Sequence, residues 1–312
     1  MKLFRLAAVL MLAIICSPSL QTSTQAKNDG RINKNLIVST EWLAKHLKDD
    51  SLVLLQVGEK KEYDAAHIPR AQFIQVSDIS TPRGQGLTLE LPSVDQLKVT
   101  FEKFGVSNKS RIVIYFSKDW VSPTARVFMT LDYLGMGKRT SILDGGLPAW
   151  RAEGRPVTAD VDQPKPGKFT ARPNTKLVVD LAWVIANQNR PGVAILDART
   201  SQFYTGAQAG QMPRAGRIPG ARSIPFNSLV EESSNGFKSV EALRQIFQNA
   251  GVKQTDRVAT YCHIGQQASL LYFVALYLGY DAHLYDGSFD EWSRRSDLPV
   301  EKSEPPTAPP KL

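Results

Sequence analysis

Apolar residues along the chain fall into two kinds of segment, short continuous runs and longer stretches with helical spacing. After Ser93, and again after Ser239, apolar side chains recur every three or four residues until a glycine at 105 or 251. This spacing predicts helices capped by the two serines and ended by the two glycines. The continuous runs predict buried strands, and they lie at 52–57, 111–116, 193–196 and 257–261.

The order of these segments indicates the class of fold. Each pair of strands is separated by a helix, and a further apolar helix is predicted between Leu270 and Leu278. Alternation of strand and helix predicts an α/β fold, in which a mostly parallel β-sheet is flanked by helices on both faces.

The whole pattern occurs twice, which predicts two domains of one kind. The matching stretches are SVDQLKVTFEKFGVSNKSRIVIY with SVEALRQIFQNAGVKQTDRVATY, HIPRAQFI with RIPGARSI, and LDGGLPAW with YDGSFDEW. We expect the domains at 35–157 and 176–302. A proline-rich linker at 158–175 would join them, and a flexible tail at 303–312 would follow.

The first 26 residues have the layout of a secretory signal peptide. Lys2 and Arg5 precede an apolar run, and the segment closes on small and polar residues that permit cleavage after Ala26. We therefore expect a secreted, periplasmic protein. The apolar run is too short to span a bilayer, and no integral membrane segment is expected in the mature chain. Lipid attachment through Cys16 is the less favoured alternative, because Ile15 is bulkier than such processing normally accepts.

Charge and composition narrow the possible partners. The formal net charge is +8, or +6 without Lys2 and Arg5, but no run of basic residues stands out, so a nucleic-acid partner is not expected. The four histidines are scattered, and His263 directly beside Cys262 lacks the usual chelating spacing. Neither a metal nor another cofactor is therefore expected.

The candidate chemistry lies in the stretch RVATYCHIGQQAS. Cys262 follows a predicted strand, and a loop with Gly265 at its bend leads into a helix. Loop amides and a helix N-terminus would together stabilise an anion there. We expect this environment to lower the cysteine pKa from about 8.5 into the range of roughly 3.5–7.5, and to make Cys262 a nucleophile. The alternative is an inert buried thiol.

The segments YCHIGQQAS and YDGSFDEW resemble the active-site half of two-domain, rhodanese-type thiosulfate and 3-mercaptopyruvate sulfurtransferases. The first copy resembles their catalytically silent domain, since Phe116 stands at the cysteine position. The resemblance implies that Cys262 takes a sulfane sulfur from a small anionic donor as a persulfide. It also implies transfer to cyanide or to a thiol, including that of a redox protein. The loop expected to hold the persulfide comprises His263, Ile264, Gly265, Gln266, Gln267 and Ala268.

The chain departs from this family at two positions that bind donors in relatives. Ile264 replaces a cation or a small hydroxyl residue, and Phe203 replaces an arginine. Arg214 and Arg217 are the nearest candidates for binding the donor's charge. Thiosulfate is favoured over 3-mercaptopyruvate as the donor, because the chain has a net positive charge and has no small hydroxyl residue at position 264. Arg199 is expected to brace the loop rather than to touch substrate.

Two other functions would also use a reactive cysteine in such a loop. A cysteine phosphatase would need an arginine six residues after the cysteine, where this chain has Ala268. A periplasmic persulfide carrier without turnover stays open, since it would need the same persulfide on Cys262.

Overall fold

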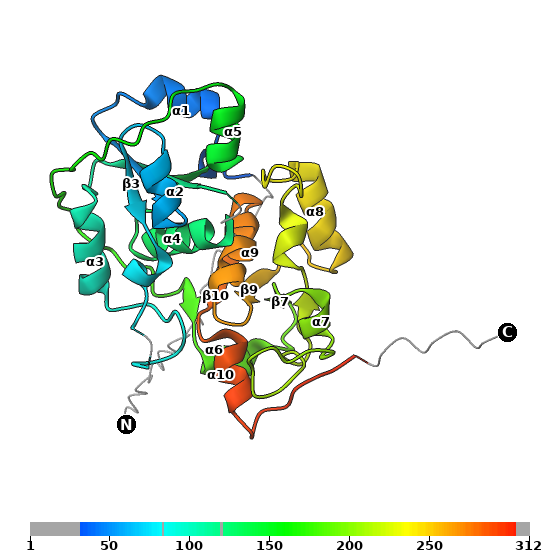
Figure 1. The fold of residues 1–312 in the computed structure, drawn as a ribbon. Helices are drawn as coiled ribbons and strands as arrows, with labels where there is room; N and C mark the ends of the chain where they lie inside the picture. Colours follow the sequence, from blue (N-terminus) through cyan, green and yellow to red (C-terminus); the bar gives the residue numbers. More distant parts are fainter. Residues whose placement is uncertain (1–31, 83, 119–120, 304–312) are drawn as a thin grey trace, which may run out of the picture.

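The computed structural model describes residues 32–82, 84–118 and 121–303, and these form two α/β domains, each built on a five-stranded parallel sheet (Figure 1). The predicted fold class is confirmed. The predicted signal peptide with Cys16, and residues 304–312 of the predicted tail, lie outside the described residues. No helix in the described ranges has the length and apolar character needed to cross a membrane.

In the first domain the strands are ordered β1-β5-β4-β2-β3, with every pair parallel. The strands are β1 (Ile37–Val38), β2 (Leu52–Val57), β3 (Ala71–Ile74), β4 (Arg111–Phe116) and β5 (Thr140–Leu143). The helices are α1 (Thr40–His46), α2 (Lys60–Ala65), α3 (Val94–Lys103), α4 (Val121–Tyr133) and α5 (Gly146–Ala152), with 3₁₀ turns at Lys34–Leu36, Val76–Ile79 and Gly137–Arg139.

The second domain repeats this topology, with the order β6-β10-β9-β7-β8. Its strands are β6 (Val178–Val179), β7 (Val193–Asp197), β8 (Arg222–Ser223), β9 (Arg257–Tyr261) and β10 (Asp281–Tyr285). Its helices are α6 (Leu181–Asn187), α7 (Ser201–Tyr204), α8 (Val240–Asn249), α9 (Gln266–Tyr277) and α10 (Ser288–Arg294), with a 3₁₀ turn at Phe226–Leu229.

The predicted helix caps explain where α3 and α8 begin and end. Ser93 accepts a hydrogen bond from the amide of Gln96, and Ser239 accepts the matching bond from Ala242. Gly105 and Gly251 follow the two helices with φ angles of +83° and +72°, a left-handed conformation that suits glycine. Local chemistry therefore sets the same boundaries in both copies.

Alternation along the strands divides the core into layers. In β4, Ile112, Ile114 and Phe116 face a central cluster, whereas Val113 and Tyr115 face an outer cluster under α1, α2 and α5. The second sheet behaves in the same way, with its own outer cluster under α6 and α10. Each sheet therefore has one face toward the other domain and one face toward its outer helices.

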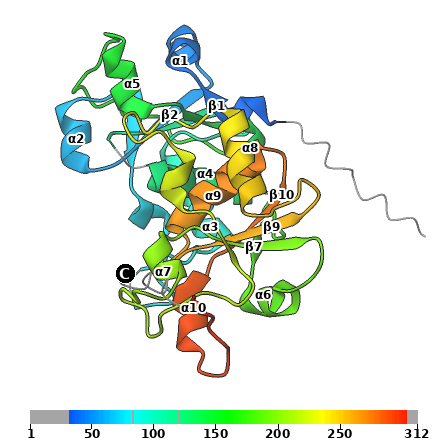
Figure 2. The same cartoon turned by 90° about the vertical axis from the view of Figure 1, so that its right-hand side faces the viewer.

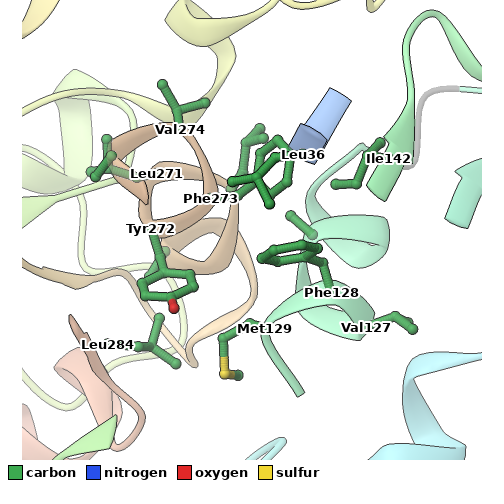
Figure 3. Packing of buried hydrophobic residues seen from close by; sticks show 14 of the residues in the cluster. Leu36, Val127, Phe128, Met129, Ile142, Leu271, Tyr272, Phe273, Val274 and Leu284 are labelled. Carbon is green, nitrogen blue, oxygen red and sulfur yellow. The ribbon is translucent and has the colours of Figure 1, made fainter. Parts of the chain in front are cut away.

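The central cluster is shared by the two domains. Helices α4 and α9 lie side by side between the sheets, as Figures 1 and 2 show. Phe128 of α4 meets Phe273 of α9 edge to face, with ring centroids 4.7 Å apart (Figure 3). Nearby, the Tyr272 hydroxyl donates to the Asp132 carboxylate over 2.5 Å. One continuous hydrophobic core therefore joins the domains.

Candidate active site

Cys262 lies directly after β9, at the carboxyl end of a central strand, where ligands of parallel sheets bind. It continues the alternation of β9, so its side chain belongs to the central cluster rather than to the outer one. It is the only cysteine in the described part of the chain and is 1% exposed. The nucleophile predicted from the sequence therefore lies on the interdomain side of its sheet.

The loop after Cys262 surrounds the thiol with backbone amides. Gly265 takes a φ of +85° at the bend, which a glycine adopts without steric penalty. The amides hydrogen-bonded to the Cys262 sulfur are those of Ile264, Gly265, Gln267 and Ala268. Most of the predicted loop thus takes part through its backbone. Gln266 begins α9, so the positive end of that helix dipole also faces the sulfur.

The turn between β10 and α10 fixes the loop from the other side. Ser288 accepts a hydrogen bond from the Cys262 amide over 3.2 Å and donates to the carbonyl of Tyr285. The amides of Phe289 and Asp290 donate to the carbonyls of Cys262 and His263, both over 2.9 Å. The cysteine's backbone is therefore held on both sides, and only its side chain remains free to react.

The predicted lowering of the cysteine pKa is wrong for this closed site. Burial raises the pKa of the Cys262 thiol, and the four amides offset only part of the effect. The sequence indicated the amides but not the degree of burial, which depends on the helices of both domains. The thiol form therefore dominates at neutral pH.

Asp197 and Arg199 form a buried pair beneath the loop, as predicted for a brace. Arg199 Nη2 donates to Asp197 Oδ2 over 2.6 Å and to the carbonyl of Gly216 over 2.8 Å. Its guanidinium lies over the ring of Phe289, 4.2 Å from the centroid. Burial opposes the charge, but Asp197 raises the pKa of Arg199 above its ordinary value. A buried ion pair therefore lies under the Cys262 loop.

The first domain lacks this ion pair. Gln56 and Gly58 occupy the positions of Asp197 and Arg199, and the Tyr115 hydroxyl donates to Gln56 Oε1 over 2.7 Å. A neutral hydrogen bond therefore replaces the ion pair where Phe116 replaces the cysteine.

His263 extends the site toward α7. Its ring packs edge to face on Phe203, with centroids 4.6 Å apart. Burial, together with the charge of Arg199, lowers the pKa of His263, so the ring is neutral at neutral pH. Phe203 is the position at which the family resemblance implied an arginine. An aromatic pair without net charge therefore takes the place of that cation.

The two arginines predicted to bind the donor's charge are committed to other partners. Arg214 donates to the carbonyls of Trp292, Ser293, Arg295 and Leu298 at 2.6–3.0 Å. The Arg214 guanidinium therefore connects the loop that follows α7 to α10 and to the segment that follows α10.

Arg217 is bound to the C-terminal segment instead. It pairs with Glu301 and donates to Ser303 Oγ over 2.9 Å. Its guanidinium also lies over the ring of Tyr204, 4.4 Å from the centroid. The structure gives both arginines a bracing role, and it does not place either guanidinium at the Cys262 loop.

Replacing Arg214 with methionine tests this correction. We expect the free energy of unfolding to fall by about 2 kcal/mol or more, because several carbonyls lose a charged donor. The KM for an anionic sulfur donor should stay within about twofold of the original. Denaturant unfolding and steady-state kinetics measure the two quantities. A large rise in KM at unchanged stability would instead restore the predicted substrate role.

The sequence pattern singled out neither Arg126 nor Asp286 as a site residue. In the structure Arg126 of α4 pairs with Asp286 across the domain interface, beside Gly265. The two residues are 160 positions apart, and no local pattern links them. In the described ranges there is no group of three or more His, Cys, Asp or Glu side chains placed to hold a metal ion.

Comparison with known proteins places both halves of the chain in one family. A model of the rhodanese-like domain matches residues 39–153 and 180–295. The sulfur carrier protein TtuD of Thermus thermophilus is 31% identical, with 88% of this chain and 99% of that protein aligned. Thiosulfate sulfurtransferase of Rattus norvegicus is 31% identical over 83% of this chain and 92% of its own. The 3-mercaptopyruvate sulfurtransferase of Escherichia coli K12 is 28% identical over 85% and 97%.

Solved structures agree on the architecture. The anaerobic ergothioneine biosynthesis enzyme from Chlorobium limicola superposes with a TM-score of 0.77 at 20% identity, covering 88% of this chain and 72% of that one. The protein YnjE gives a TM-score of 0.74 at 23% identity, over 87% of this chain and 69% of its own. At these identities the likeness shows the fold alone.

Proposed function

Because the chain belongs to the family of proteins built from rhodanese-like domains, we propose that it is a sulfurtransferase that carries sulfane sulfur on Cys262. The observation that carries the proposal is the convergence of four backbone amides on the Cys262 sulfur at the end of β9. Such donors are already oriented for an anion and need no rearrangement when charge develops. The relatives named as sulfurtransferases or sulfur carriers align over more than four-fifths of the chain and give independent support.

The proposed reaction consists of two displacements. In the first, the Cys262 thiolate attacks the outer sulfur of thiosulfate, the sulfur–sulfur bond breaks, and sulfite leaves with the bonding electron pair. The enzyme then holds a persulfide whose terminal sulfur is negatively charged. In the second, cyanide or a thiolate attacks that terminal sulfur and the Cys262 thiolate leaves. Ping-pong kinetics should follow from the covalent intermediate.

For the donor we propose thiosulfate ahead of 3-mercaptopyruvate. The chain is basic overall, and Ile264 offers neither hydroxyl nor charge at the position that relatives use for recognition. Thiosulfate is a dianion whereas 3-mercaptopyruvate carries a single carboxylate charge, so the net positive charge of the chain favours thiosulfate. Comparison of kcat/KM for the two donors, with cyanide as common acceptor, tests this order. A preference for 3-mercaptopyruvate would reverse it.

A persulfide carrier is the second candidate, and two observations favour it. One close match in sequence is itself named a sulfur carrier protein. In addition, the thiol is 1% exposed, which would shield a stored persulfide from water and oxidants. A carrier would load stoichiometrically from a protein donor yet turn over neither small donor with cyanide. Steady-state assays combined with intact mass measurement therefore separate carrier from enzyme.

The pH dependence of persulfide formation follows from the burial of Cys262. Because burial raises the thiol pKa, the thiolate fraction at neutral pH is small and grows about tenfold per pH unit. We expect the rate of sulfite release in a single turnover to rise about tenfold per pH unit, or about a hundredfold between about pH 6 and pH 8. Rapid mixing with thiosulfate, without acceptor, measures it. A rate that levels off below pH 7 would show that the amides outweigh burial.

A further inference from the structure

The first domain reaches the active-site loop through one buried ion pair. Arg126 of α4 is fully buried, and its Nη1 donates to Asp286 Oδ1 over 2.6 Å. Its Nη2 donates to the carbonyl of Leu89 over 2.6 Å, whereas its Nε, also buried, has no hydrogen-bond partner. Asp286 Oδ2 accepts from the amide of Leu91 over 3.1 Å. The pair thus joins two segments of the first domain to the turn after β10.

This ion pair lies against the bend of the loop that holds the sulfur. A Cβ atom placed on Gly265 would lie 3.0 Å from Arg126 Nη1 and 3.1 Å from Asp286 Oδ1. The backbone of Gly265 is therefore in close contact with both members of the pair. The loop amides that face the Cys262 sulfur come directly before and after this point. A shift of either side chain would move them.

The duplicated architecture supplies a natural comparison. Asp144, the counterpart of Asp286 in the first domain, accepts the equivalent hydrogen bond from the amide of Phe237, over 2.9 Å. The two interdomain hydrogen bonds are thus related by the duplication. However, the position in α9 that matches Arg126 is Leu270, counted back from the Leu-Gly pairs that follow the two helices. The buried arginine therefore belongs only to the side of the interface that faces the cysteine.

We propose that Arg126 and Asp286 are a positioning pair for the sulfur-carrying loop, so that the domain without a cysteine completes the active site of the other. The inference rests on the proposed function of Cys262. Arg126 holds Asp286, and together they limit how far Gly265 and its neighbouring amides can move. The first domain thus contributes to the active site of the second domain, in addition to forming its own hydrophobic core.

The charges of Arg126 and Asp286 cancel, so removing either one changes the net charge beside the loop, and this change can be tested. Loss of Arg126 would leave the Asp286 carboxylate beside the loop and disfavour a thiolate, whereas loss of the Asp286 charge would leave the guanidinium and favour one. The other charged or titratable groups around the loop are Asp197, Arg199 and His263 beneath and beside it, and Asp290 in α10, which pairs with Arg294. All of these stay unchanged in the variants below.

The experiment titrates the Cys262 thiolate by its ultraviolet absorbance in Arg126→Met, Asp286→Asn and the original protein, with Cys262→Ala as the blank. We expect the midpoint to rise by about one pH unit in Arg126→Met and to fall by about one unit in Asp286→Asn. Turnover should drop about tenfold in both, because the amides are less well aligned. Since the titration needs no sulfur donor, it remains informative even if the protein transfers no sulfur.

Asp144→Asn is the matched control, because it weakens the equivalent interdomain hydrogen bond, which Asp144 at the end of β5 accepts from Phe237. Its thermal stability should change about as much as that of Asp286→Asn, with no shift of the thiolate midpoint. Should Arg126→Met fail to fold, Arg126→Lys keeps the charge and should reduce turnover while leaving the midpoint near the original. Equal midpoints in the Asp144 and Asp286 variants, or shifts of the same sign in the Arg126 and Asp286 variants, would overturn the proposal.

Discussion

A Cys262→Ser variant is expected to lose sulfur transfer completely, by a factor of about 10³ or more. A serine oxygen cannot form a persulfide, and the four loop amides alone supply no nucleophile. The fold should persist, since the side chain changes by one atom and the loop amides can donate to a hydroxyl as they do to sulfur. The free energy of unfolding should change by about 1 kcal/mol or less.

Intact mass spectrometry after treatment with thiosulfate measures this directly. The original protein should gain the mass of one sulfur atom and lose it again on addition of cyanide, whereas the serine variant should gain nothing. Circular dichroism and thermal unfolding of both proteins serve as the control for folding. Sulfur loading of the variant at the original level would place the persulfide elsewhere and contradict the assignment of Cys262.

The second large effect is expected at the bend of the loop, in Gly265→Ala. An added methyl group would lie 3.0 Å from Arg126 Nη1 and 3.1 Å from Asp286 Oδ1, which is closer than ordinary van der Waals contact, in a left-handed conformation that alanine disfavours. The bend would then move, and the amides on either side of it would no longer point toward the Cys262 sulfur. Loss of one such donor typically lowers kcat by about 10²–10³-fold, and we expect a loss in that range.

Gly251→Ala is the control for Gly265→Ala. Gly251 also has a positive φ, +72°, but a Cβ atom there would meet nothing within 4 Å. Both variants carry the conformational strain, so both should lose about 1 kcal/mol of stability. Only Gly265→Ala should lose turnover. If the two variants kept equal activity, the geometry of the bend would not matter for the reaction.

Much of the fold follows from local pattern, which explains why it could be predicted. Four apolar runs became β2, β4, β7 and β9 at or within one residue of the expected positions, since a buried parallel strand needs continuous apolar residues. Ser93 and Ser239 cap helices because their hydroxyls reach an amide three residues on. The candidate nucleophile was identified for the same reason, as strand end, glycine and helix start are neighbours in the sequence.

The parts of the site that could not be predicted depend on contacts between distant segments. The partners of Arg214 are carbonyls 78 to 84 positions away, so its bracing role has no local sign. Whether the pKa of Cys262 is raised or lowered depends on whether burial or the loop amides have the larger effect. The cluster that buries Cys262 includes helices of both domains. Arg126 and Asp286 meet only when the two domains pack.

The continuous core between α4 and α9 has a consequence for how this chain can evolve. The first copy, which has Phe116 at the cysteine position, packs against the second along this core. Here its removal would expose Phe273 and the other apolar side chains of α9 to water, and would create a surface prone to aggregation. The first copy therefore keeps this surface covered, and substitutions along the contact between α4 and α9 are expected to be constrained in both halves of the chain.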